Sequence, residues 1–110
     1  MERLVKGDVI VFPFPFSDLS TSKKRPALIL SVLEGDDLIL CQITSEARHD
    51  KYSIELKSSD FKQGKLNIVS MIRPNRLFTG EKSLIKYKIG SLKENKLRDV
   101  INKLIEIFNN

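Results

Sequence analysis

Short apolar runs separated by polar turns recur along most of the chain, a pattern typical of a mainly β protein. The runs that predict strands are residues 8–14, 27–32, 38–45, 52–57, 66–73 and 83–89. The run 27–32, apolar except at Ser31, is typical of a central strand, whereas 52–57 alternates, as a strand with one solvent-exposed face does. Pro13 and Pro15 lack a backbone donor, so we expect the first strand to end or bulge there.

The hydrophobic period changes towards the C-terminus, where it predicts an amphipathic helix. The apolar positions at three- and four-residue spacing are Leu97, Val100, Ile101, Leu104, Ile105 and Phe108. Ser91 and Glu94 have the spacing of a capping box, which predicts the start of this helix. The whole pattern favours a single domain over residues 1–110 with a mainly β (α+β) fold, a small bent β-barrel of five to seven short strands with a C-terminal helix.

Length and cysteine content narrow the class of protein. The 110 residues suffice for one hydrophobic core. Cys41 is the only cysteine, which excludes an intrachain disulfide and favours a reducing compartment, and its apolar neighbours predict a buried, unreactive thiol. Residues 1–6 lack the apolar stretch of a signal peptide, and no apolar run approaches the ~20 residues of a membrane span. We therefore expect a soluble, cytoplasmic protein with no membrane partner.

Charge is distributed unevenly along the chain. Residues 1–50 hold 6 Lys and Arg against 8 Asp and Glu, whereas residues 51–110 hold 13 against 6. From Arg73 to Lys88, Glu81 is the only acid among five bases. This segment is either a solvated basic surface or a patch that follows nucleic-acid phosphates, with Arg73 and Arg76 as candidate RNA contacts.

Several kinds of catalytic site are missing from the sequence. His49 is the only histidine. There is no Cys/His cluster, no set of three carboxylates at metal-ligand spacing and no glycine-rich phosphate loop. A metal enzyme and a nucleotide-triphosphate enzyme are therefore poor fits, and we expect neither metal nor cofactor. Any catalysis must use arginine, hydroxyl groups and backbone amides.

Two polar clusters contain such groups. The first is the predicted loop 17–25, which contains Ser17, Asp18, Ser20, Thr21, Ser22, Lys23, Lys24 and Arg25. The second, residues 42–46, contains Thr44, Ser45 and Glu46. If strands 27–32 and 38–45 form an antiparallel hairpin, Thr44 returns towards Arg25, which we place where the loop meets a strand beginning at Pro26. The alternative is a solvated loop beside a polar strand end.

Four segments carry a resemblance to a known family. Gly-Asp-Val at 7–9, Arg-Pro-Ala-Leu-Ile-Leu at 25–30, Gln-Ile-Thr-Ser at 42–45 and Ile-Arg-Pro at 72–74 resemble the PemK/MazF family of toxin ribonucleases. Together with the terminal helix, the resemblance covers nearly the whole chain. The segment 14–20 resembles the PemK-like branch more than the better-known glycine-containing loops.

The resemblance implies an SH3-like barrel that forms a homodimer and cleaves single-stranded RNA, including mRNA, at short sequences without metal. It also implies a cognate antitoxin that covers the RNA groove. The family's catalytic arginine falls on Arg25 and its catalytic hydroxyl on Thr44, with Ser45 as the alternative because a slip of one residue exchanges the faces of a strand. The general base stays open between Asp18 and Glu46, which are near in sequence only.

The remaining RNA contacts are predicted from charge and stacking. Lys23 and Lys24 would steer the phosphates, and the loop residues Ser17, Ser20, Thr21 and Ser22, together with Glu46, would line the groove. The stacking candidates are Phe14, Phe16 and Phe78, whereas Phe12 and Phe108 are expected in the core. Two other functions remain open: a non-catalytic barrel that binds nucleic acid or antitoxin, and an interaction protein whose groove binds a peptide helix.

Overall fold

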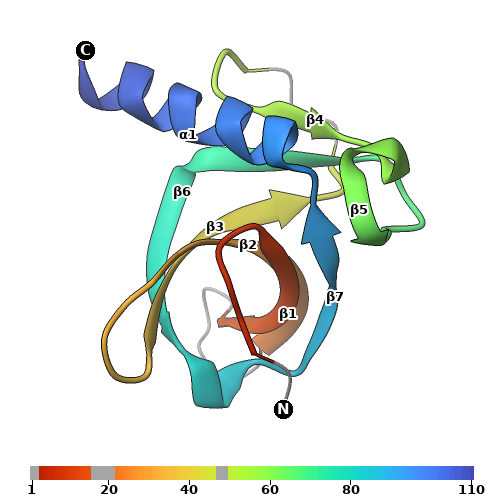
Figure 1. The fold of residues 1–110 in the computed structure, drawn as a ribbon, viewed down its shortest axis with the longest axis vertical. Coiled ribbons are helices and arrows are strands. Elements are labelled where there is room, and N and C mark those ends of the chain that lie inside the picture. The colour runs from red at the N-terminus through yellow and green to blue at the C-terminus, as the bar shows by residue number, and fades with distance from the viewer. Residues whose placement is uncertain (1–2, 16–21, 47–49) are drawn as a thin grey trace.

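The computed structural model describes residues 3–15, 22–46 and 50–110, which form one curled antiparallel sheet and one helix (Figure 1). The strands are β1 (Asp8–Pro15), β2 (Ser22–Val32), β3 (Asp37–Thr44), β4 (Ile54–Leu56), β5 (Phe61–Gly64), β6 (Ser70–Glu81) and β7 (Tyr87–Leu92). Their order in the sheet is β4-β6-β3-β2-β1-β7-β5, and helix α1 (Glu94–Phe108) follows β7. The predicted mainly β fold with a C-terminal helix is confirmed.

Both faces of the curled sheet are apolar, and each packs a separate core. One core lies between the sheet and α1, which contributes the buried Val100 and Leu104. The other fills the opposite face with Ile10, Phe12, Ala27, Ile29, Leu38 and Leu40. Cys41 is fully buried in the first core, as predicted, and burial raises the pKa of its thiol to about 12, so the thiol stays protonated and unreactive.

Strands β1 and β2 pair over a longer stretch than the sequence predicts. The ladder continues through Pro13 opposite Lys24 and ends with Pro15 opposite Ser22. Strand β7 pairs only with the first half of β1, up to Val11, so the two prolines need no donor on that side. Strand β2 therefore begins at Ser22, and the prediction that it starts at Pro26 is wrong.

Strand β6 contains a large bulge in its pairing with β3. Gln42 lies opposite Arg73, but the preceding Cys41 lies opposite Leu77. Three residues of β6, Pro74, Asn75 and Arg76, therefore have no partner on β3. This bulge lets one continuous strand curl around the barrel (Figure 1).

Other predicted element bounds need correction. The strand predicted at 66–73 begins only at Ser70 and continues to Glu81. It continues past Pro74 because this proline lies in the bulge, where no hydrogen bond to β3 is needed. The strand predicted at 83–89 is a 3₁₀ turn, Lys82–Leu84, followed by β7. The strand predicted at 52–57 shortens to Ile54–Leu56. The sequence did not predict β5, whose four residues are too few for a recognisable alternation.

The capping box predicted at Ser91 and Glu94 is wrong. The N-cap residue of α1 is Lys93, and it makes no side-chain cap. Ser91 instead lies buried in β7, where its hydroxyl donates a hydrogen bond of 2.7 Å to the buried carboxylate of Asp8. Phe108, predicted in the core, is 69% exposed because it lies in the last turn of α1, beyond the buried Leu104.

Candidate functional site

Arg25 and Thr44 approach one another at the open end of the β2–β3 hairpin. Ala27 pairs with Gln42, and continuing this register by two residues sets Arg25 opposite Thr44. On its other side Arg25 pairs with Phe12 of β1. The hairpin expected from the apolar runs is therefore present, with Arg25 half-buried inside β2 and not at its first residue.

The pleat separates the two candidate hydroxyls. Residues directly opposite one another share a face of a sheet, so Thr44 lies on the same face as Arg25. Thr44 is buried, and its Oγ1 accepts a hydrogen bond of 3.2 Å from the backbone N–H of Glu46. Ser45, one residue further on, is exposed just beyond the end of β3.

A pocket of about 250 Å³ lies at this end of the hairpin, and Arg25, Thr44 and Ser45 all line it. Lys23 and Lys24, both exposed, add positive charge to its wall. The loop between β5 and β6 forms another part of the wall through Leu66, Asn67 and Ile68. This one pocket is therefore lined by cationic side chains, by the hydroxyl groups of Thr44 and Ser45, and by the apolar residues Leu66 and Ile68.

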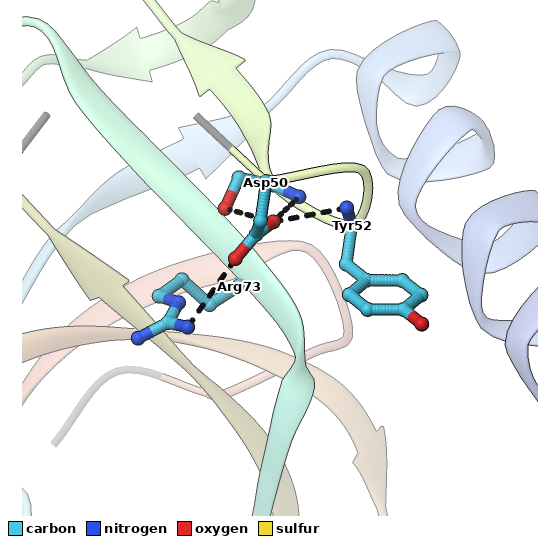
Figure 2. A network of polar contacts seen from close by, with 4 residues as sticks. Asp50, Tyr52 and Arg73 are labelled. Carbon is cyan, nitrogen blue, oxygen red and sulfur yellow. Dashed lines mark hydrogen bonds and ion pairs between the residues drawn. The ribbon is translucent and has the colours of Figure 1, made fainter. Parts of the chain in front are cut away.

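Arg73 lies on the Arg25 face of the sheet, opposite Gln42, and is 7% exposed. One guanidinium nitrogen lies 3.5 Å from a carboxylate oxygen of Asp50, as Figure 2 shows. Its Nε is buried and has no hydrogen-bond partner among the described residues. In this arrangement Arg73 faces Asp50. Arg76, in the bulge, is exposed to solvent.

Asp50 is the centre of a compact hydrogen-bond network (Figure 2). One carboxylate oxygen accepts bonds from the backbone N–H groups of Tyr52 (2.9 Å) and Ser53 (2.8 Å) and from the Ser53 hydroxyl (2.9 Å). The Ser53 hydroxyl, these two N–H groups and the positive charge of Arg73 hold the pKa of Asp50 below its ordinary value. Asp50 therefore holds the turn at residues 50–53 together.

The structure separates the predicted site residues into three groups. Lys23, Lys24, Arg25, Thr44 and Ser45 share one pocket. Arg73 is buried against Asp50, and Arg76 lines a different pocket. The candidates Phe16, Ser17, Asp18, Ser20 and Thr21, together with His49, lie outside the described residues, as does the side chain of Ser22. The sequence did not predict Asp50 or residues 66–68 of the pocket wall, because neither belongs to a recognisable motif.

Residues 3–15, 22–46 and 50–110 contain no group of three or more His, Cys, Asp or Glu side chains that could hold a metal ion. Over the same residues, no helix is long and apolar enough to cross a membrane.

Comparison with known proteins agrees with this architecture. The family described as the PemK-like, MazF-like toxin of type II toxin–antitoxin systems matches residues 5–108. The chain belongs to this family. It is therefore a toxin of the type II toxin–antitoxin class. A separate comparison with curated protein sequences found no significant match.

Solved structures of the same fold include a mycobacterial endoribonuclease in complex with its cognate antitoxin, with 14% identity and a TM-score of 0.78 over 97% of this chain and 96% of that one. The MazE–MazF complex of Deinococcus radiodurans has 18% identity and a TM-score of 0.76, with 96% of each chain covered. MazF of the same organism has 18% identity and a TM-score of 0.75, with 100% of each chain covered. At these identities the similarity establishes the fold.

Proposed function

We propose that this toxin is a metal-independent endoribonuclease that cleaves single-stranded RNA, including mRNA, at short sequences. The observation that carries the proposal is the placement of the Arg25 guanidinium and the Thr44 hydroxyl on one face at the open end of a single hairpin. The family membership and the endoribonuclease described among its structural neighbours support the same activity.

The proposed reaction is an internal transesterification. The ribose 2′-oxygen attacks the adjacent phosphorus as it loses its proton to a base, and the bond to the 5′-oxygen of the next nucleotide breaks. The products are a 2′,3′-cyclic phosphate and a 5′-hydroxyl. Negative charge builds on the non-bridging phosphate oxygens, and fixed donors aimed at those oxygens lower the barrier.

Arg25 supplies the main stabilisation of this charge. Its planar guanidinium can donate two parallel hydrogen bonds to a phosphate and offers no acceptor, which makes it an anion stabiliser and a poor base. The Thr44 oxygen already accepts a bond from Glu46 N–H, so its own hydrogen is free to point at a phosphate oxygen. Glu46 is a candidate base because it follows Thr44 closely; Asp18 is the other candidate.

Further contacts would position the RNA. Lys23 and Lys24 are exposed on the pocket wall and would bind flanking phosphates, and Ser45 offers a second hydroxyl at the rim. Phe16, Ser17, Ser20, Thr21 and Ser22 are proposed as further RNA contacts. Arg76 would bind phosphate from the bulge, and Arg73 would act through Asp50 by holding the turn at residues 50–53 in place.

We also propose a cognate antitoxin and a homodimer in the cytoplasm. Among the structural neighbours named above, one is an endoribonuclease in complex with its cognate antitoxin and another is a MazE–MazF complex. These complexes support an antitoxin partner for this chain. The apolar residues Ile68 and Val69, 63% and 56% exposed beside the pocket, are available for a protein contact.

The test is incubation of the purified protein with a mixed-sequence single-stranded RNA in EDTA, followed by mapping of cut sites and end groups. We expect discrete cuts with cyclic-phosphate ends from the wild type, none from Arg25→Ala, and normal cutting from Arg98→Ala, an exposed arginine on α1. Intact RNA from the folded wild type would contradict the ribonuclease and favour the non-catalytic nucleic-acid-binding or antitoxin-docking barrel.

A further inference from the structure

A second pocket, of about 290 Å³, opens beside the Arg25–Thr44 site. Its lining residues are Phe12, Pro13, Phe14, Gln42, Arg76, Leu77 and Phe78. They come from β1, β3 and β6. Gln42 and Phe14 lie in segments that carry the family resemblance, but the resemblance implies no role for either. The pocket shares the face of the sheet that carries Thr44, since Gln42 precedes Thr44 by two residues on β3.

The walls of this pocket are aromatic. The rings of Phe14 and Phe78 lie 4.9 Å apart at 73°, and Phe12 packs edge-on to Phe14 at 6.1 Å. Phe12 is buried, but Phe14 and Phe78 are only half-buried and keep ring surface open towards the pocket. Exposed aromatic surface of this kind is what an unstacked base packs against.

Two polar groups frame the aromatic surface. The side-chain amide of Gln42 is half-buried and carries two donor hydrogens and an acceptor oxygen. Arg76 is exposed and comes from the β6 bulge. An amide beside exposed aromatic rings suits the edge of a base, and a guanidinium at the rim suits a phosphate.

We propose that this pocket binds the unpaired base of a nucleotide next to the one whose phosphate lies at Arg25 and Thr44. The proposal rests on the proposed function for the position of the RNA backbone. Thr44 and Gln42 lie about 6.6 Å apart along β3, which is comparable to one nucleotide of an extended strand. The base lies against Phe14 and Phe78, the Gln42 amide bonds its edge, and Arg76 binds the phosphate beyond it.

The amide also favours one base. A glutamine side chain can bond adenine through two edge atoms at once, accepting from the amino group and donating to a ring nitrogen. Cytosine offers the same pair of atoms, but adenine presents more ring surface to Phe14 and Phe78. Adenine therefore fits this pocket best, and the pocket contributes base selectivity at one position next to the cut.

The experiment is an NMR titration with non-cleavable 2′-deoxy hexanucleotides. Each probe carries one base on an otherwise abasic backbone, and a fully abasic hexanucleotide serves as the phosphate-only control. The chain has two glutamines, so the side-chain amide signal of Gln42 is followed with that of Gln63, exposed on β5, as internal reference. We expect the Gln42 signal to move with the one-base probes, most with adenine, and neither signal to move with the abasic strand.

Two variants complete the test. Gln42→Leu should abolish the preference among bases while Gln63→Leu preserves it, and Phe14→Leu should weaken binding of the one-base probes roughly 5- to 100-fold relative to the abasic strand. A Gln42 signal that responds to none of the four bases would overturn the pocket, even if the wild type cleaves RNA. A preference for another base would overturn the assignment of adenine. A responding pocket in a protein that fails to cleave RNA would retain this site and reject the ribonuclease.

Discussion

Arg73 and Asp50 form an ion pair at 3.5 Å between β6 and the turn that follows the 47–49 segment. The arginine is buried and the aspartate is partly exposed, with side-chain exposures of 8% and 36%. Asp50 also holds two backbone N–H groups and the Ser53 hydroxyl. The pair therefore joins a buried positive charge to a structured turn, next to the strand end that carries Thr44.

The Asp50 network should make stability depend on pH. The pKa of Asp50 is lower in the folded protein than its ordinary 3.8, so the stabilisation is complete above that value and is lost as the pH falls through the folded pKa. Asp50→Asn should therefore destabilise the protein at pH 7, with a difference from wild type that shrinks in acid. Urea unfolding followed by circular dichroism between pH 7 and pH 2 measures this difference. A difference independent of pH would contradict the assignment. Glu55→Gln serves as the control, because Glu55 pairs with Lys57 at an exposed site where an ion pair contributes little.

The buried bond from Ser91 to Asp8 should be worth more than a surface bond. Ser91→Ala removes one donor from a buried carboxylate that also accepts a bond from Val5 N–H and lies 3.5 Å from Lys88. We expect a loss of about 1.5–3 kcal/mol in the free energy of unfolding, the range for a hydrogen bond to a charged group. Ser83→Ala, which removes an exposed 3.4 Å contact to Glu81, should change it by less than about 0.5 kcal/mol. Equal effects of the two substitutions in urea unfolding would argue against a special role for Asp8.

The contact of β5 with β7 depends on two glycines that face one another. Gly64 pairs with Gly90, and a Cβ on Gly90 would collide with the backbone oxygen of Gln63. Gly90→Ala should therefore cost at least about 2–3 kcal/mol, because backbone must move. Gly35 has a positive φ of 74° but open space around it, so Gly35→Ala should cost only about 1–2 kcal/mol from backbone strain. Thermal unfolding of both variants ranks them, and the reverse order would contradict the close approach.

Arg25 should affect the chemical step more than binding. Arg25→Ala removes a preorganised donor and should lower the single-turnover cleavage rate on the order of 10²-fold or more with the fold intact. Arg25→Lys keeps the charge but loses the two-pronged geometry and should recover only part of the rate. Normal cleavage by a folded Arg25→Ala protein would exclude the proposed mechanism.

Lys23 and Lys24 should act through the salt dependence of binding. Each lysine that contacts a phosphate contributes a slope of roughly 0.7 in a plot of log affinity against log salt for a single strand. The double substitution of Lys23 and Lys24 by Gln should therefore flatten the slope by about 1.4 for a 2′-deoxy oligonucleotide. Lys57→Gln, at an exposed site paired with Glu55, should leave the slope unchanged. An unaltered slope in the double variant would remove these lysines from the interface.

Local patterns in the sequence predicted the hairpin that carries Arg25 and Thr44. The run 27–32 is apolar except at Ser31 and is followed by Gly35 with a positive φ, so strand, turn and strand are each visible within a few residues. The position of Thr44 relative to Arg25 then follows from antiparallel pairing alone.

Long-range contacts decided the features that the sequence did not reveal. Ser91 matches a local capping motif, yet its hydroxyl binds Asp8, 83 residues away. Arg73 and Arg76 look equivalent in a basic segment, but only the tertiary structure buries one and exposes the other. Both cases depend on pairing between distant strands, which no local window contains.

The three-residue bulge in β6 has a consequence for how this surface can change. On a regular strand, Arg73 and Phe78 are five positions apart and would point to opposite sides. The bulge places both on one side, opposite Gln42 and Leu40. Insertion or deletion of a single residue there would exchange the two faces of the rest of β6. It would turn Phe78 to the other side of the sheet. One such event could replace a pocket wall while the hairpin bearing Arg25 and Thr44 keeps its register.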